Sequence, residues 1–133
     1  MENFDKWNIF KKLLSQKSEI SDSKILFKEG EIWCASIGYN LGEEVYGKGE
    51  KFRRPVIVFR KLTSNSCIAI PLTSKDKDGS WYHKFEIENS SRCAMMHQAR
   101  VLSTLRFESR MSTMSENDFK KLKNAVGKFY NIF

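Results

Sequence analysis

The chain has 133 residues, a length that suits one folded domain with a single hydrophobic core. Its 23 Lys and Arg residues against 16 Asp and Glu residues give a formal net charge of +7, which favours polyanionic partners, with nucleic acid as the first candidate. A basic surface without a specific partner would have the same charge. The cysteines are odd in number, far apart and without a C-x-x-C pair, so neither a disulfide framework nor a zinc knuckle is indicated: Cys34, Cys67 and Cys93.

The N-terminus lacks the uninterrupted apolar stretch of a signal peptide, and no apolar run approaches membrane-spanning length. We therefore expect a cytoplasmic protein with no membrane segment. Buried, reduced thiols are the simplest account of the cysteines in that compartment.

The first predicted element is a short amphipathic helix over residues 5–16, followed by a polar linker over residues 18–24. We expect residues 1–28 to form this added helix and linker, and residues 29–133 to form the main domain. The apolar positions of the helix share one stripe: Trp7, Ile9, Phe10, Leu13 and Leu14.

From residue 30 the hydrophobic period changes to two, which predicts strands. The connections are too short for the crossover helices of a parallel sheet, so we expect a small antiparallel barrel or curled sheet. Pro71 fits an edge or a strand terminus. The expected strands cover residues 31–38, 54–61, 66–73, 81–88 and 93–102.

A C-terminal helix is predicted to begin after Ser115, which with Asp118 makes a near-match to a capping box. Its apolar stripe should pack on the sheet. The stripe consists of Phe119, Leu122, Val126 and Phe129.

Arg54 stands between a glycine-rich loop and the apolar run 56–58, which is predicted to be a buried strand. An arginine at a strand mouth either clamps a phosphate group or simply opens a hairpin at the surface. Thr73 and Ser74 stand at the end of the following expected strand, residues 66–73, where a hydroxyl could bind a phosphate oxygen or cap the turn. The residues leave both pairs of alternatives open.

The two histidines differ in setting. His83 alternates with apolar neighbours and is expected to be structural, whereas His97 interrupts an apolar run together with Gln98 and Arg100. These three are either part of a half-exposed strand or donors that line a groove. No nucleophile elbow, flanking carboxylate pair or phosphate-binding Gly-Lys loop is present, so metal-free phosphoryl chemistry without a cofactor is what remains.

Several segments together resemble the MazF/PemK-type toxins of bacterial toxin–antitoxin systems, over roughly residues 29–110. No single motif is specific, but their order and spacing are. The segments are Gly30-Glu31-Ile32-Trp33, Gly42-Glu43-Glu44, Arg54-Pro55-Val56-Ile57-Val58, Ile70-Pro71-Leu72-Thr73 and Gln98-Ala99-Arg100-Val101-Leu102.

The resemblance implies a small SH3-like antiparallel barrel with a C-terminal helix, assembled as a homodimer. It also implies a metal-independent endoribonuclease that cleaves single-stranded RNA. In that reaction the ribose 2′-hydroxyl attacks the adjacent phosphate and leaves a 2′,3′-cyclic phosphate. A cognate antitoxin then stops cleavage by occupying the groove.

Residue by residue, the resemblance gives Arg54 the role of stabilising charge on the reacting phosphate and makes Thr73 the groove threonine. Glu44 or His97 would be the general base, and His97 departs from the acidic residue that is usual there. The remaining expected RNA-binding residues are Gln98, Arg100, Arg53, Ser74 and Lys48.

Two other functions stay open at this stage. Toxins of the CcdB type share the barrel but poison gyrase by binding it, because a fold does not fix a function. A non-catalytic RNA-binding barrel would instead stack bases on aromatic residues such as Trp81 and Tyr82.

Overall fold

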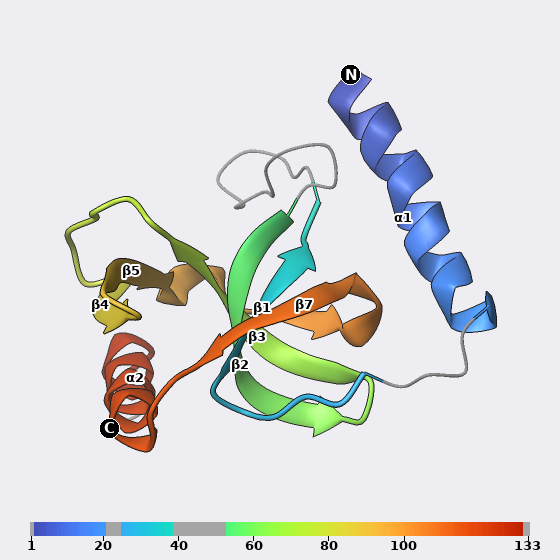
Figure 1. Cartoon of the computed structure of the whole chain (residues 1–133). Helices are drawn as coiled ribbons and strands as arrows, with labels where there is room; N and C mark the ends of the chain where they lie inside the picture. The colour runs from blue at the N-terminus through green and yellow to red at the C-terminus, as the bar shows by residue number, and fades with distance from the viewer. Residues whose placement is uncertain (1, 21–24, 39–52, 132–133) are drawn as a thin grey trace.

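The computed structural model describes residues 2–20, 25–38 and 53–131. In this part of the chain a long helix precedes a seven-stranded sheet, and a second helix follows it (Figure 1). Neither helix is long and apolar enough to cross a membrane. In chain order the elements are α1 (Glu2–Ile20), β1 (Glu31–Ser36), β2 (Arg53–Thr63), β3 (Ser66–Thr73), β4 (Tyr82–Ile87), β5 (Ser90–Met95), the 3₁₀ turn η1 (Met96–Gln98), β6 (Arg100–Ser103), the 3₁₀ turn η2 (Thr104–Arg106), β7 (Phe107–Thr113) and α2 (Glu116–Phe129).

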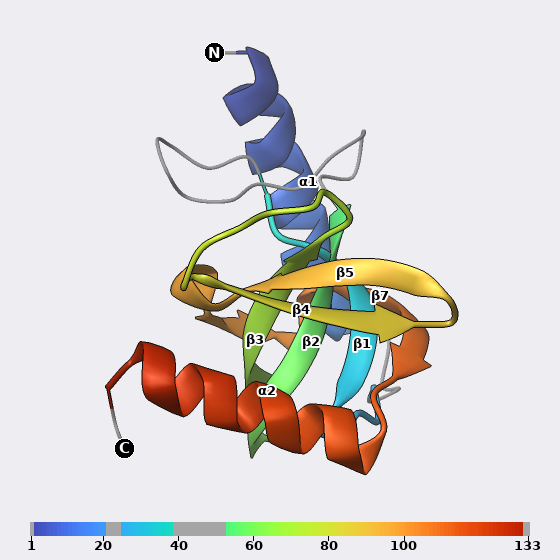
Figure 2. The same cartoon turned by 90° about the vertical axis from the view of Figure 1, so that its left-hand side faces the viewer.

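The sheet has the strand order β4-β5-β3-β2-β1-β7, and β6 also pairs with β3. The pairings are antiparallel, and the strands curl around one another without closing into a complete barrel (Figure 1). Helix α2 lies across one side of the sheet, whereas α1 lies on another side of the molecule (Figure 2). The expected curled antiparallel fold with a C-terminal helix is confirmed.

The strands at the centre of the sheet are buried on both faces. Val56 and Val58 of β2 pack into a core with Trp33 and Phe107, while Ile57 between them points into a second core beneath α2. Strand alternation sends neighbouring residues to opposite faces, so a strand covered on both sides has a continuous apolar sequence. This explains the unbroken apolar run in β2.

The predicted strand 93–102 is wrong in its continuity, because η1 interrupts it. Strands β5 and β6 run along the same neighbour, β3, with Leu72 opposite Ala94 and Ala69 opposite Arg100. The stretch of β3 between these pairs contains Pro71, which has no amide hydrogen to give to a continuous ladder. The chain bulges into η1 at this point.

Strand β7 was not predicted. Most of its side chains are polar or exposed, and Phe107 is the one fully buried residue in its run. It forms a strand because it pairs with β1, and the Phe107 ring stacks on Trp33 at 5.2 Å between centroids. Pairing with a distant strand overrides a weak local pattern.

Helix α1 docks through a narrower stripe than predicted. Trp7 and Leu14 are buried, but Ile9 and Leu13 are exposed to 63% and 57%. The Trp7 indole packs against Gly38, where an added Cβ would lie 2.5 Å from Cε2 of the indole. The contact fixes α1 beside the end of β1.

Helix α2 begins as predicted, since the Ser115 hydroxyl accepts a hydrogen bond from the Asp118 amide at 3.1 Å. Leu122 and Val126 are buried against the second core, and Phe119 and Phe129 are partly buried beside them. The capping box therefore identified the start of the helix, and the apolar stripe identified its buried face.

The Glu31 carboxylate ties three segments together at the start of β1. It accepts hydrogen bonds from the Lys28 amide, the Trp33 indole and the Arg110 guanidinium at 2.7, 3.2 and 3.0 Å. Burial alone would raise the pKa of Glu31, but these hydrogen bonds and the positive charge of Arg110 outweigh it and hold the pKa below its ordinary value of 4.5.

We expect Gly38→Ala to undock α1. Gly38 has φ of +96°, a left-handed backbone conformation that is strained for alanine. The added methyl group would also clash with the Trp7 indole, which should destabilise the docked helix by a further amount of about 1–3 kcal/mol. Gly79→Ala is the control, because Gly79 also has positive φ (+120°) but no heavy atom within 4 Å of the added Cβ. Hydrogen exchange should accelerate in α1 only in the Gly38 variant, and equal protection in both variants would contradict this role of Trp7.

Glu31 should make the free energy of unfolding depend on pH in the acidic range. Because its pKa is depressed in the folded state, its contribution is complete above about pH 4.5 and is lost as the pH falls through the folded pKa. Urea unfolding should therefore show wild type more stable than Glu31→Gln at neutral pH, with the difference shrinking below pH 4.5. Glu86→Gln, which removes an exposed carboxylate, should show no such convergence.

Candidate functional site

The start of β2 and the end of β3 lie side by side at one end of the central sheet. Val56 pairs with Pro71, and extending this antiparallel register by two residues brings Arg54 beside Thr73. Arg54 is half-buried, and its Nη1 donates a hydrogen bond to the Leu72 carbonyl at 3.2 Å. Arg54 and Thr73, which the sequence analysis placed at the ends of two expected strands, are therefore neighbours.

Around this point the surface forms a hollow of about 110 Å³, here called the arginine hollow. Thr73 is 8% exposed, and its hydroxyl accepts a hydrogen bond from the Lys75 amide at 3.2 Å. A hydroxyl has one hydrogen to donate, so Thr73 can still donate into the hollow. The lining consists of Arg53, Arg54, Pro55, Leu72, Thr73, Ser74 and Arg92.

Arg53 lines the hollow beside Arg54 but is held by a different contact. Its guanidinium forms an ion pair of 3.1 Å with Glu108 on β7, and Glu108 also accepts a hydrogen bond from the Ser36 hydroxyl at 3.2 Å. This pair anchors Arg53 toward β1 and β7. Arg54 faces β3 instead, as its bond to Leu72 shows.

Arg92 on β5 completes the hollow and was not identified from the sequence. It is half-buried and lies opposite Phe85 of β4. The predicted strand began at residue 93, which left Arg92 in a turn. Its position two residues before the buried Ala94 is the signal that could have revealed it, because residues two apart share a strand face.

The histidines lie away from the arginine hollow. His97 sits on η1 between the rings of Trp81 and Tyr82, at centroid distances of 5.0 and 5.3 Å, and its Nδ1 finds no partner among the described residues. His83 stacks on Phe85, and burial lowers its pKa; Asp118 and Lys121 of α2 act on it in opposite directions. His83 therefore belongs to the packing between the hairpin and α2.

Gln98 and Arg100 do not share one strand face, because Gln98 ends η1 and Arg100 begins β6. Neither lines the arginine hollow. Arg100 lies near Arg106, whose pKa is lowered by burial and by the positive charge of Arg100. Glu44 and Lys48 lie outside the described residues.

No group of three His, Cys, Asp or Glu side chains in the described ranges is placed to hold a metal ion. The three cysteines lie on β1, β3 and β5 and are free thiols. Burial raises the pKa of Cys67 to about 11, so its thiol stays protonated at neutral pH.

Three guanidinium groups and two hydroxyls around one hollow suit an anion with several oxygens. A guanidinium forms forked hydrogen bonds with phosphate and remains charged at any physiological pH. The hydroxyls of Thr73 and Ser74 add neutral donors from the end of β3. The arrangement can therefore hold a phosphate group and stabilise additional negative charge on it.

Several solved structures have the same fold as this chain. An endoribonuclease from a mycobacterial species, solved with its cognate antitoxin, matches 81% of this chain and 98% of its own with a TM-score of 0.60 at 9% identity. The Mycobacterium tuberculosis toxin MazF-mt6 matches 76% and 96% with a TM-score of 0.56 at 10% identity. MazF from Deinococcus radiodurans matches 80% and 98% with a TM-score of 0.62 at 16% identity.

None of the curated proteins matches this sequence significantly. A family model described as "PemK-like, MazF-like toxin of type II toxin-antitoxin system" matches residues 28–130. This range contains the whole sheet, α2 and every residue that lines the arginine hollow. The chain therefore belongs to the PemK-like, MazF-like toxin family of type II toxin–antitoxin systems.

Proposed function

We propose that this protein is a toxin endoribonuclease that cleaves single-stranded RNA without a metal ion. The ribose 2′-hydroxyl attacks the neighbouring phosphate, the 5′-oxygen leaves, and a 2′,3′-cyclic phosphate remains. The observation that supports this most strongly is the arginine hollow, in which Arg54 and Thr73 are brought together with two further arginines.

The charge in the hollow suits this reaction. Attack on a phosphodiester adds negative charge to the phosphate oxygens, and fixed donors aimed at that charge lower the barrier. Arg53 is partly neutralised by Glu108, and Arg54 and Arg92 bring two further guanidinium groups to the hollow from β2 and β5. These guanidinium groups provide the electrostatic stabilisation that a metal ion gives in other nucleases.

Each residue has a distinct part in the proposed reaction. Arg54 stabilises the extra charge on the phosphorane or protonates the leaving oxygen, and the bond to Leu72 O fixes its guanidinium in place. Thr73 donates its hydroxyl hydrogen to a phosphate oxygen. Ser74 and Arg53 bind the phosphate backbone from the rim of the hollow.

We assign the role of general base to Glu44 rather than to His97. His97 is partly buried against the rings of Trp81 and Tyr82 and does not line the hollow, so it is poorly placed to take the 2′-hydroxyl proton. Gln98, Arg100 and Lys48 are the further residues that we propose to bind the RNA backbone.

The proposed partners follow from the family. A cognate antitoxin neutralises the toxin, and one similar structure is such a complex. The active form is a homodimer, with one RNA strand bound across both copies. The net charge of +7 attracts RNA to this surface.

Arg54→Ala should abolish most of the activity. Loss of a charged donor at the transition state typically lowers the rate about 10²–10³-fold. Purified protein is incubated with a long single-stranded RNA in EDTA, and the cut ends are mapped for cyclic phosphate. Arg60→Ala is the matched control, because Arg60 is an exposed arginine on the same strand that does not line the hollow.

Full activity in a folded Arg54→Ala variant would contradict the role of the hollow. Intact RNA with the wild-type protein would overturn the enzyme and favour the two other functions. RNA binding that weakens with salt would then indicate a binding module, and an absence of RNA binding would indicate a toxin that acts on a protein target.

Two substitutions separate the hydrogen-bonding role of the Thr73 hydroxyl from the space that the side chain fills. Thr73→Val keeps the side-chain volume but removes the donor, so cleavage should fall about 10²-fold, while stability falls by about 1 kcal/mol because the Lys75 amide loses its acceptor. Thr73→Ser restores the hydroxyl and should recover most of the rate. Equal rates for the valine and serine variants in a cleavage time course would rule out a hydrogen bond from Thr73.

A further inference from the structure

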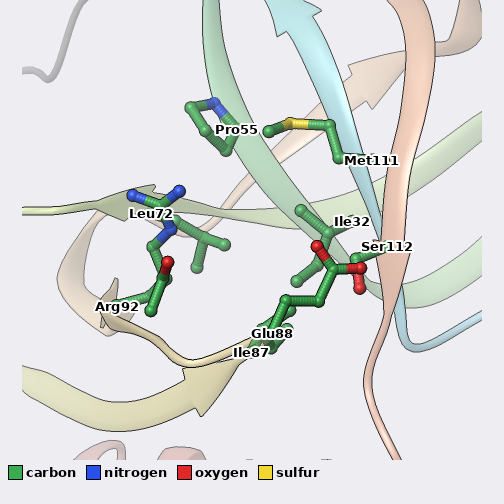
Figure 3. A pocket seen from close by; sticks show the side chains of 9 residues that line it. Ile32, Pro55, Leu72, Ile87, Glu88, Arg92, Met111 and Ser112 are labelled. Atoms are coloured by element: carbon green, nitrogen blue, oxygen red, sulfur yellow. The ribbon is translucent and has the colours of Figure 1, made fainter.

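A second hollow adjoins the arginine hollow and lies between the β4–β5 hairpin and the central sheet (Figure 3). It also has a volume of about 110 Å³. The two hollows share Pro55, Leu72 and Arg92, so a ligand in one lies directly beside a ligand in the other. Apolar side chains make up most of its walls: Ile32, Pro55, Leu72, Ile87 and Met111.

The polar groups of this second hollow lie at its rim. Figure 3 shows the Glu88 side chain extending from the hairpin toward Ser112, while Arg92 stands on the opposite side. In the part of the chain that the structure describes, neither Glu88 nor Arg92 has a hydrogen-bonding or ionic partner. An exposed carboxylate without a partner among the described residues thus stands at the rim of a largely apolar hollow, beside the arginine hollow.

Glu88 occupies an unfavourable backbone position. It has φ of +52° and, with Asn89 at +65°, forms the two-residue turn that joins Ile87 to Ser90. Such turns favour glycine and asparagine, because other side chains are strained in left-handed backbone. Strained residues of this kind cluster at functional sites.

A nucleobase matches these walls and this rim. Its faces are apolar and its edges carry donors and acceptors, whereas its sugar connects it to a phosphate. An ionised carboxylate only accepts hydrogen bonds, and guanine is the base that presents two adjacent donors, N1–H and the N2 amino group, on its Watson–Crick edge. Two parallel hydrogen bonds to one carboxylate combine strength with geometric selectivity.

We propose that the second hollow holds a guanine base next to the phosphate in the arginine hollow, with Glu88 reading its N1–H and N2 amino donors. This inference rests on the proposed ribonuclease function and names the feature that selects its cleavage site. Arg92, at the shared wall, orients the nucleotide between the two hollows.

The test compares the cut sites of three proteins on one RNA pool of random sequence. Wild type should cut with guanine strongly preferred at one fixed position beside the scissile phosphate. Glu88→Gln should shift that position toward adenine, because an amide offers one acceptor and one donor, which match adenine. The change in preference should be about tenfold or more, as expected for a bidentate base contact.

Glu88→Gly removes the carboxylate and suits the left-handed turn, so it should fold well and cut with no preference at that position. Glu86→Gln has the same change of charge on the same hairpin but lies outside the second hollow, and it should keep the wild-type pattern. Cleavage by wild type with no fixed base, or the same pattern in all variants, would overturn the guanine pocket and leave the ribonuclease intact.

A binding experiment tests the base preference of the second hollow independently of RNA cleavage. The methyl signal of Met111, labelled for NMR, should move on titration with guanosine monophosphate at about tenfold lower concentration than with adenosine monophosphate, and Glu88→Gln should reverse this order. The same result would support the pocket even if wild type left RNA intact. A signal that moves with neither nucleotide would overturn the proposal and leave the hollow as a surface for a protein partner.

Discussion

The burial of the central strands on both faces is the constraint on which the rest of the structure depends. Strands β1, β2 and β3 separate two cores, one containing Trp33 and Phe107 and the other covered by α2. Side chains in the middle of these strands must be apolar, since an unpaired polar group there would lose its hydration. Polar chemistry is therefore confined to the strand ends, which is where Arg54 and Thr73 lie.

The two helices act on this sheet in different ways. Helix α2 supplies one wall of a core through Leu122 and Val126 and so belongs to the fold itself. Helix α1 precedes the part of the chain that the family model matches, and it attaches through Trp7 to Gly38 and to the guanidinium of Arg106, 5.4 Å from the ring centroid. It adds a contact at the end of β1 that the sheet does not need for its own cores.

Features set by local sequence could be predicted, and features set by pairing could not. The apolar run in β2, the cap at Ser115 and the strand mouth at Arg54 all follow from neighbouring residues, and each led to the correct element. The bulge at η1 depends on Pro71 of another strand, and β7 depends on its pairing with β1. Arg92 was missed because its place in the hollow depends on where the hairpin turns.

The interruption at η1 also separates the β4–β5 hairpin from the rest of the sheet. The β4–β5 hairpin joins the central sheet through two residue pairs, Leu72 with Ala94 and Thr73 with Cys93. Arg92 and Glu88 lie on the hairpin, whereas Arg54 lies on the central sheet, so both hollows span this short seam. The width of both hollows is therefore set by how the hairpin docks on the central sheet, through this seam and through Phe85 and Ile87, which pack against the second core.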